Sequence, residues 1–156
     1  MPHTYDFFVA PLACPVCGQT SPADITTNMT TYLRDQPDMA SLRVGDPLAI
    51  DPERVSAKRY DGYLVVRPPE PGEPIRILQR WDCPSCCTPA QWAEILVANG
   101  VIDSIAAVRF DYEHFARSHL VANDAIDVAA ELTGESYPRL LEQDLVQLLR
   151  ERLPAG

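Results

Sequence analysis

The chain has 156 residues, and 46% of them are hydrophobic, so it is long enough to bury a core and too hydrophobic overall to be disordered. Its 22 acidic and 13 basic side chains give a net charge of −9. This balance argues against a partner held by phosphate charge, because nucleic-acid binders usually carry a basic face.

The N-terminal segment begins with a short aromatic strand, predicted over residues 5–10. The apolar run continues to Cys14, but no Lys or Arg precedes it and Pro11 interrupts it, so we do not interpret it as a signal peptide. No stretch approaches the roughly 20 apolar residues needed to span a membrane. We therefore expect a cytoplasmic protein without a membrane association, in which thiols stay reduced and paired cysteines favour a metal over disulfides.

Proline divides the chain, because thirteen of the fifteen prolines lie in residues 1–89, where long helices are disfavoured. Three further strands are predicted there, at residues 25–33, 62–67 and 75–81. A long irregular connection is expected over residues 34–55. The last two strands are predicted to form a hairpin that leads into Cys83, with Arg76 and Arg80 pointing to solvent.

The residues after the second cysteine pair are predicted to be mainly helical. Thr88, Pro89 and Gln91 form the pattern of a helix start, with an N-cap, a proline at the first helical position and a capping box. This helix is expected to end at Gly100. Residues 101–110 are predicted to be a strand. Three more helices are expected, at residues 111–119, 124–132 and 138–153, the last with a stripe of leucines.

Two cysteine pairs share the pattern C-P-x-C: Cys14 with Cys17, and Cys83 with Cys86. A C-x-x-C turn directs both sulfurs toward one point, and two such turns supply the four thiolates that a structural Zn²⁺ prefers. We therefore predict a zinc site made of all four cysteines. Zinc is favoured over iron, which takes the same ligand set.

The first pair, followed by Gly18, resembles the metal knuckle of zinc ribbons and rubredoxins, whereas the second pair precedes a predicted helix, as in a treble clef. The expected fold is α+β: a proline-rich antiparallel β module of the zinc-ribbon or treble-clef type, followed by a mainly helical half. We expect residues 1–89 to form the zinc-binding module with an inserted loop. Residues 90–156 are expected to pack on it within one compact domain.

A closed four-thiolate site stabilises a fold and leaves no position for a reacting water. We therefore predict a non-enzymatic structural-zinc protein that acts by binding another protein. The C-terminal helix offers a face for a partner or for a second copy of the chain.

The sequence is also compatible with two alternative functions. The strand ending at Trp81, followed by C-P-S-C and a helix, resembles the active-site unit of glutaredoxins, which implies a thiol-disulfide oxidoreductase with Cys83 as nucleophile and Cys86 as resolving thiol. The second alternative is a zinc-ribbon accessory protein that contacts nucleic acid through Arg76, Arg80 and Trp81. The acidic charge balance opposes it.

Three other residues are candidate site residues: Cys87, His114 and His119. Cys87 is either a small core thiol, a reactive free thiol or a substitute ligand for Cys86. His114 and His119 are five residues apart, which on a helix does not place them on one face as a two-histidine metal motif requires.

Overall fold

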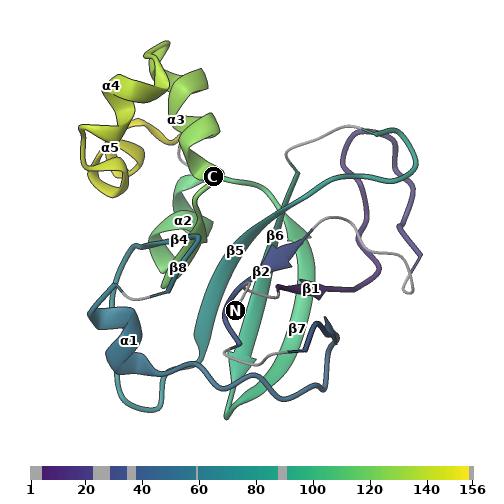
Figure 1. Ribbon diagram of the computed structural model, residues 1–156. Coiled ribbons are helices and arrows are strands. Elements are labelled where there is room, and N and C mark those ends of the chain that lie inside the picture. The colour runs from purple at the N-terminus through teal and green to yellow at the C-terminus, as the bar shows by residue number, and fades with distance from the viewer. Residues whose placement is uncertain (1–4, 23–28, 35–37, 59, 88–90, 155–156) are drawn as a thin grey trace.

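The computed structural model describes residues 5–22, 29–34, 38–58, 60–87 and 91–154 (Figure 1). These residues form a mixed α+β fold with two sheets and five helices. The strands are β1 (Asp6–Phe8), β2 (Thr30–Thr31), β3 (Ser41–Leu42), β4 (Tyr63–Val65), β5 (Ile75–Trp81), β6 (Gln91–Ala98), β7 (Val101–Val108) and β8 (Leu120–Ala122). The helices are α1 (Pro52–Ser56), α2 (Tyr112–Arg117), α3 (Ala125–Thr133), α4 (Tyr137–Leu141) and α5 (Leu145–Arg152).

The larger sheet has five strands in the order β4-β8-β5-β6-β7. Strands β5, β6 and β7 form an antiparallel meander, whereas β8 runs parallel to β5, with Ile77 opposite Leu120. Strands β4 and β5 therefore are not neighbours, and the predicted hairpin of residues 62–67 with residues 75–81 is wrong. The strands themselves are correct, but β8 lies between them because it pairs with both.

The helix predicted from Thr88 to Gly100 is also wrong, because residues 91–98 form strand β6 (residues 88–90 lie outside the described residues). Its buried side chains include Ala93, Ile95 and Val97, which recur at every second position as in a strand. The strand pairs with β5 on one side and β7 on the other, so its backbone hydrogen bonds are satisfied within the sheet. The strand predicted over residues 101–110 is confirmed as β7.

The smaller sheet has the order β2-β1-β3 and comes entirely from the N-terminal part of the chain. Strand β1 confirms the expected strand at residues 5–10. Strand β2 is the described part of the strand predicted over residues 25–33, of which residues 25–28 lie outside the described residues. In the expected irregular connection over residues 34–55, of which residues 35–37 lie outside the described residues, the described part contains only β3 and the start of α1 as regular elements.

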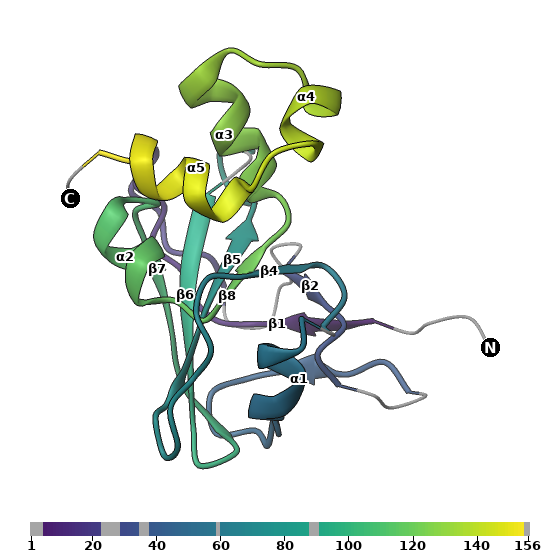
Figure 2. The same cartoon turned by 90° about the vertical axis from the view of Figure 1, so that its left-hand side faces the viewer.

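The helices of the C-terminal part follow two of the three predictions. Helix α2 is confirmed, and α3 ends at Gly134, whose φ of 73° makes the left-handed C-cap that glycine favours. The single helix expected over residues 138–153 is instead two, α4 and α5. It is interrupted because Asp144 caps a new helix, accepting from the amides of Val146 and Gln147. Figure 2 shows α3, α4 and α5 together at one end of the larger sheet.

The core lies around the central strand β5. Ile77 and Leu78 point to opposite faces of the sheet and both are fully buried, so this strand is covered on both sides. Residue 89, predicted as the boundary between two parts, falls between β5 and β6, which pair with each other in the same sheet. The residues after 90 supply three strands of that sheet as well as four helices.

Candidate metal centre

The first cysteine pair lies at the tip of a short hairpin, in which Ala13 and Thr20 form an antiparallel bridge. The amide of Gly18 donates to the carbonyl of Cys14 at 2.9 Å, which closes the turn around the pair. Gly18 has a φ of 73°, a conformation that glycine adopts without steric cost. The glycine after the second cysteine is therefore part of what allows the chain to reverse here.

The second pair is built in the same way. It joins β5 to β6, whose ends meet where Trp81 pairs with Gln91. The amide of Cys87 donates to the carbonyl of Cys83 at 2.9 Å, and Cys87 has a φ of 57°. Cys87 thus occupies the position that Gly18 occupies in the first turn. The second pair lies between two strands, not at the start of a helix, so the expectation of a treble-clef arrangement is wrong.

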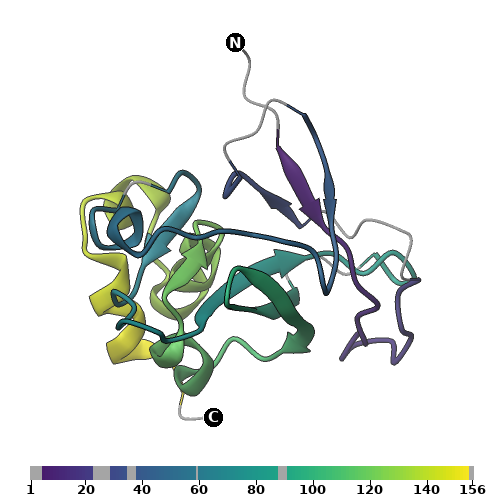
Figure 3. The same cartoon turned by 90° about the horizontal axis from the view of Figure 1, so that it is seen from below.

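The two turns place all four predicted sulfurs together. The Sγ atoms of Cys14 and Cys86 are 3.8 Å apart, those of Cys17 and Cys83 are 3.7 Å apart, and all four lie within 4.8 Å of one another. Four sulfurs held at about 2.3 Å from one tetrahedral zinc lie about 3.8 Å from each other. The group therefore fits a metal ion such as zinc. Figures 1 and 3 show the two loops side by side at one edge of the molecule.

Backbone amides face the sulfurs, as expected for thiolate ligands. The amide of Val16 lies 3.4 Å from the Sγ of Cys14. The pKa of Cys83 is lowered, chiefly by the amide of Cys86 with help from that of Ser85, although burial opposes the shift. These N–H groups stabilise the charged form that a metal binds.

At Cys17 the pKa is raised, and the neighbouring thiols contribute to this. The amide of Gln19 is the largest single influence and lowers the pKa of this thiol, but burial and the three neighbouring thiols together raise it to about 11. Four thiolates at these distances repel one another, so their joint ionisation requires a cation between them.

The site joins parts of the chain that are far apart in sequence. The two short sulfur–sulfur contacts connect residues 72 and 66 positions apart. Cys14 and Cys83 are each only 2% exposed and belong to the hydrophobic core. A metal here would fasten the N-terminal hairpin to the central hairpin of the larger sheet.

Cys87 lies outside the sulfur group and is exposed. Because its left-handed φ strains a side chain with a Cβ by roughly 1–2 kcal/mol, we expect Cys87→Gly to keep the metal and to raise the free energy of unfolding by about 1 kcal/mol. Cys87→Val, with a branched Cβ, should lower it. Urea unfolding of the metal-loaded variants measures both changes. Loss of metal from Cys87→Gly would show instead that Cys87 is a ligand.

Comparison of the chain with protein-family models, with curated proteins and with solved structures finds no match in any of the three. Among the described residues, no helix is long and apolar enough to cross a membrane.

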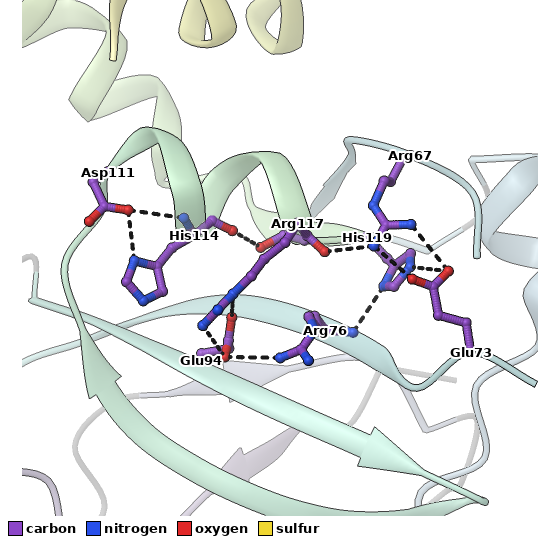
Figure 4. Close-up of polar contacts among 9 residues, drawn as sticks. Arg67, Glu73, Arg76, Glu94, Asp111, His114, Arg117 and His119 are labelled. Carbon is purple, nitrogen blue, oxygen red and sulfur yellow. Dashed lines mark hydrogen bonds and ion pairs between the residues drawn. The ribbon is translucent and has the colours of Figure 1, made fainter. Parts of the chain in front are cut away.

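A second polar cluster, which the sequence did not predict, lies across the larger sheet (Figure 4). Glu94 on β6 accepts from Arg76 at 3.3 Å and from two nitrogens of Arg117 at 2.8 Å each. Arg80 lies 3.3 Å from Asp124. Arg76 and Arg80, which were predicted to point to solvent, are only partly exposed, with 32% of each side chain accessible, because each is held in ion pairs with carboxylates.

His114 and His119 have separate partners in this cluster. His114 pairs through Nδ1 with Asp111, the N-cap residue of α2, at 2.7 Å. His119 is fully buried: its Nδ1 accepts from the amide of Arg76 at 3.0 Å, and its Nε2 lies 3.1 Å from Glu73. Neither belongs to the sulfur group.

His119 should make the stability of the protein depend on pH. Burial lowers its pKa from the ordinary value of 6.5, although Glu73 opposes this. The unfolded chain therefore binds a proton first as the pH falls through about 6.5, and the free energy of unfolding should fall with it. Urea midpoints at about pH 7.5 and about pH 6 test this. His119→Asn, which retains an acceptor for the Arg76 amide, should reduce the slope, and an unchanged slope would contradict the assignment.

Proposed function

We propose that this chain is a non-enzymatic protein with a structural zinc, bound by Cys14, Cys17, Cys83 and Cys86, and that it acts by binding another protein in the cytoplasm. The observation that supports the zinc site is that two turns, each closed by the same backbone hydrogen bond, bring four sulfurs together. Their separations match those of a tetrahedral four-sulfur site.

The zinc would act as a clamp between two hairpins. Both cysteine pairs lie where the chain reverses between antiparallel segments, which supports a zinc-ribbon arrangement. A structural zinc contributes on the order of 10 kcal/mol of apparent binding free energy, and where the site forms only in the folded chain this becomes folding free energy. With four protein ligands the metal has no position left for a substrate or a water.

The geometry gives the redox alternative less support. Cys83, the expected nucleophile, is 2% exposed, and its sulfur lies 3.7 Å from that of Cys17, which belongs to the other turn. A nucleophilic thiolate at the start of a helix is accessible and has a resolving thiol beside it. Here a strand, not a helix, follows the pair.

The nucleic-acid alternative has less support, because its proposed contact residues are buried or held in ion pairs. Trp81 is fully buried and cannot stack on a base, while Arg76 and Arg80 are held by carboxylates. With a net charge of −9, a partner protein with a basic surface is the better match.

Elemental analysis of the purified chain tests the proposal. We expect zinc in a ratio near one per chain, with Cys87 as the reactive thiol of the native protein and the other four thiols titrating only after denaturation with a chelator. Cobalt substitution should give the absorption of a tetrahedral thiolate site. A metal-free protein with a reversible Cys83–Cys86 disulfide would overturn the proposal and favour the oxidoreductase.

A further inference from the structure

Strand β4 forms an open edge of the larger sheet. It is the last strand in the sheet order, and among the described residues it pairs on one side only, with β8. A three-residue strand with one partner leaves a row of backbone groups available to another strand.

The register shows which backbone groups these are. The amide of Val66 donates to His119, and the amide of Asn123 donates to Gly62, so these two opposed pairs are hydrogen-bonded. Hydrogen-bonded and non-bonded pairs alternate in an antiparallel ladder. Tyr63 and Val65 therefore direct their N–H and C=O groups away from β8. Within the described part of the chain, no hydrogen bond occupies these four groups.

An apolar groove runs along this edge. It has a volume of about 340 Å³ and lies between β4 and the turn that joins α4 to α5. Its lining includes Leu64 and Val65 from the strand, and Leu141, Leu145 and Val146 from the helices. Leu141 is 72% exposed, so its side chain is accessible to a ligand in the groove.

We propose that this groove binds an extended, basic segment of a partner protein, which adds to β4 as a sixth strand of the sheet. An open strand edge beside a helical wall is the arrangement in which peptides bind by strand addition: main-chain hydrogen bonds hold the peptide and pockets select alternate side chains. The proposal deepens the proposed function and depends on its protein-binding part.

Charge and polarity specify the chemistry of that segment. The side chain that faces Leu141 and Leu145 must be apolar. Asp144 in the lining and Glu142 beside it are exposed on the helical wall, whereas Lys58 is the basic side chain of the lining, on the opposite side next to β4. Residues 125–152, which form α3 to α5 and their connections, carry six acidic and three basic side chains. A lysine or arginine next to the apolar side chain of the bound segment complements the acidic residues of the helical wall.

A second copy of this chain is a poorer occupant. Each copy carries a net charge of −9, and pairing of β4 with β4 of a second copy would bring the acidic helical walls of both copies close together. A partner of the opposite charge avoids this repulsion.

The test is a display library of short random peptides, selected against the full-length, metal-loaded chain. We expect enrichment of peptides that alternate apolar and polar residues and contain Lys or Arg. On binding, the amides of Tyr63 and Val65 should become protected from hydrogen exchange, because they gain partners.

Two variants and a control separate the groove from other surfaces. Val65→Pro removes an outward N–H while leaving the bonds to β8, and Leu141→Asp places a charge on the apolar wall; each should weaken binding by about tenfold or more. Val44→Asp, at a residue that is 54% exposed and outside the groove, should bind as the native chain does. Circular dichroism and zinc content confirm that each variant folds.

Three results would overturn the groove assignment. The first is a library without enriched peptides, which would also count against the protein-binding part of the proposed function. The second is enriched peptides that bind Val65→Pro and Leu141→Asp as tightly as the native chain, which would leave protein binding intact but place it elsewhere. The third is a native dimer that Leu141→Asp dissociates, which would make the second copy the occupant.

Discussion

Replacing one buried ligand, in Cys14→Ser or Cys83→Ser, should abolish cooperative folding. A structural zinc contributes on the order of 10 kcal/mol, and a domain of this size is stable by only about 5–15 kcal/mol. Each change removes one of four thiolates and leaves the other three crowded without the cation that balances them. Thermal unfolding followed by circular dichroism, together with zinc content, measures the loss.

Cys87→Ser is the matched control, because it changes a cysteine in the same loop but outside the sulfur group. It should retain zinc and a cooperative transition. A soluble Cys14→Ser variant that melts cooperatively near the native temperature would mean that the site does not stabilise the fold.

The cluster of four cysteines was predictable from sequence because each half of it is specified by a short local motif. Each C-P-x-C turn encodes a chain reversal within five residues, and the same hydrogen bond closes both turns. Cys87 stands where Gly18 stands in the first turn, so the second pair resembles a rubredoxin knuckle less closely than the first. The structure explains the substitution: the residue keeps the left-handed conformation and is exposed, so its side chain displaces nothing in the core.

Strand β6 was mispredicted because its sequence carries two patterns at once. Trp92, Ile95 and Leu96 have helical spacing, and Thr88-Pro89 with Gln91 imitates a helix start. The alternation of Ala93, Ile95 and Val97 was present as well, and tertiary context decided between them. The cysteine turn reverses the chain beside β5, where an extended segment gains a full ladder of hydrogen bonds.

The position of β8 could not be read from sequence for a different reason. It pairs in parallel with β5, more than forty residues earlier in the chain, and in antiparallel fashion with β4. Neither pairing leaves a local signal. The cluster around Glu94 depends on the same long-range pairings, because Arg76, Glu94 and Arg117 come from two adjacent strands and a helix.

Trp81→Ala should be the most destabilising single change outside the metal ligands. Trp81 is fully buried, ends β5 two residues before Cys83, and donates through Nε1 to the carbonyl of Trp92 at 3.0 Å. Removing a buried tryptophan costs about 3–5 kcal/mol, and here it also leaves the Trp92 carbonyl without its donor. Urea unfolding of the metal-loaded protein measures the change.

Trp81→Phe separates packing from hydrogen bonding, because it keeps an aromatic ring and lacks the N–H. We expect a smaller loss of about 1–3 kcal/mol. Since Trp81 pairs with Gln91 at the base of the second cysteine turn, its removal should also loosen the geometry of Cys83 and Cys86, and competition with a chelator should show weaker zinc binding by Trp81→Ala. Unchanged zinc affinity despite the lost stability would show that the turn holds its shape independently of the strands that carry it.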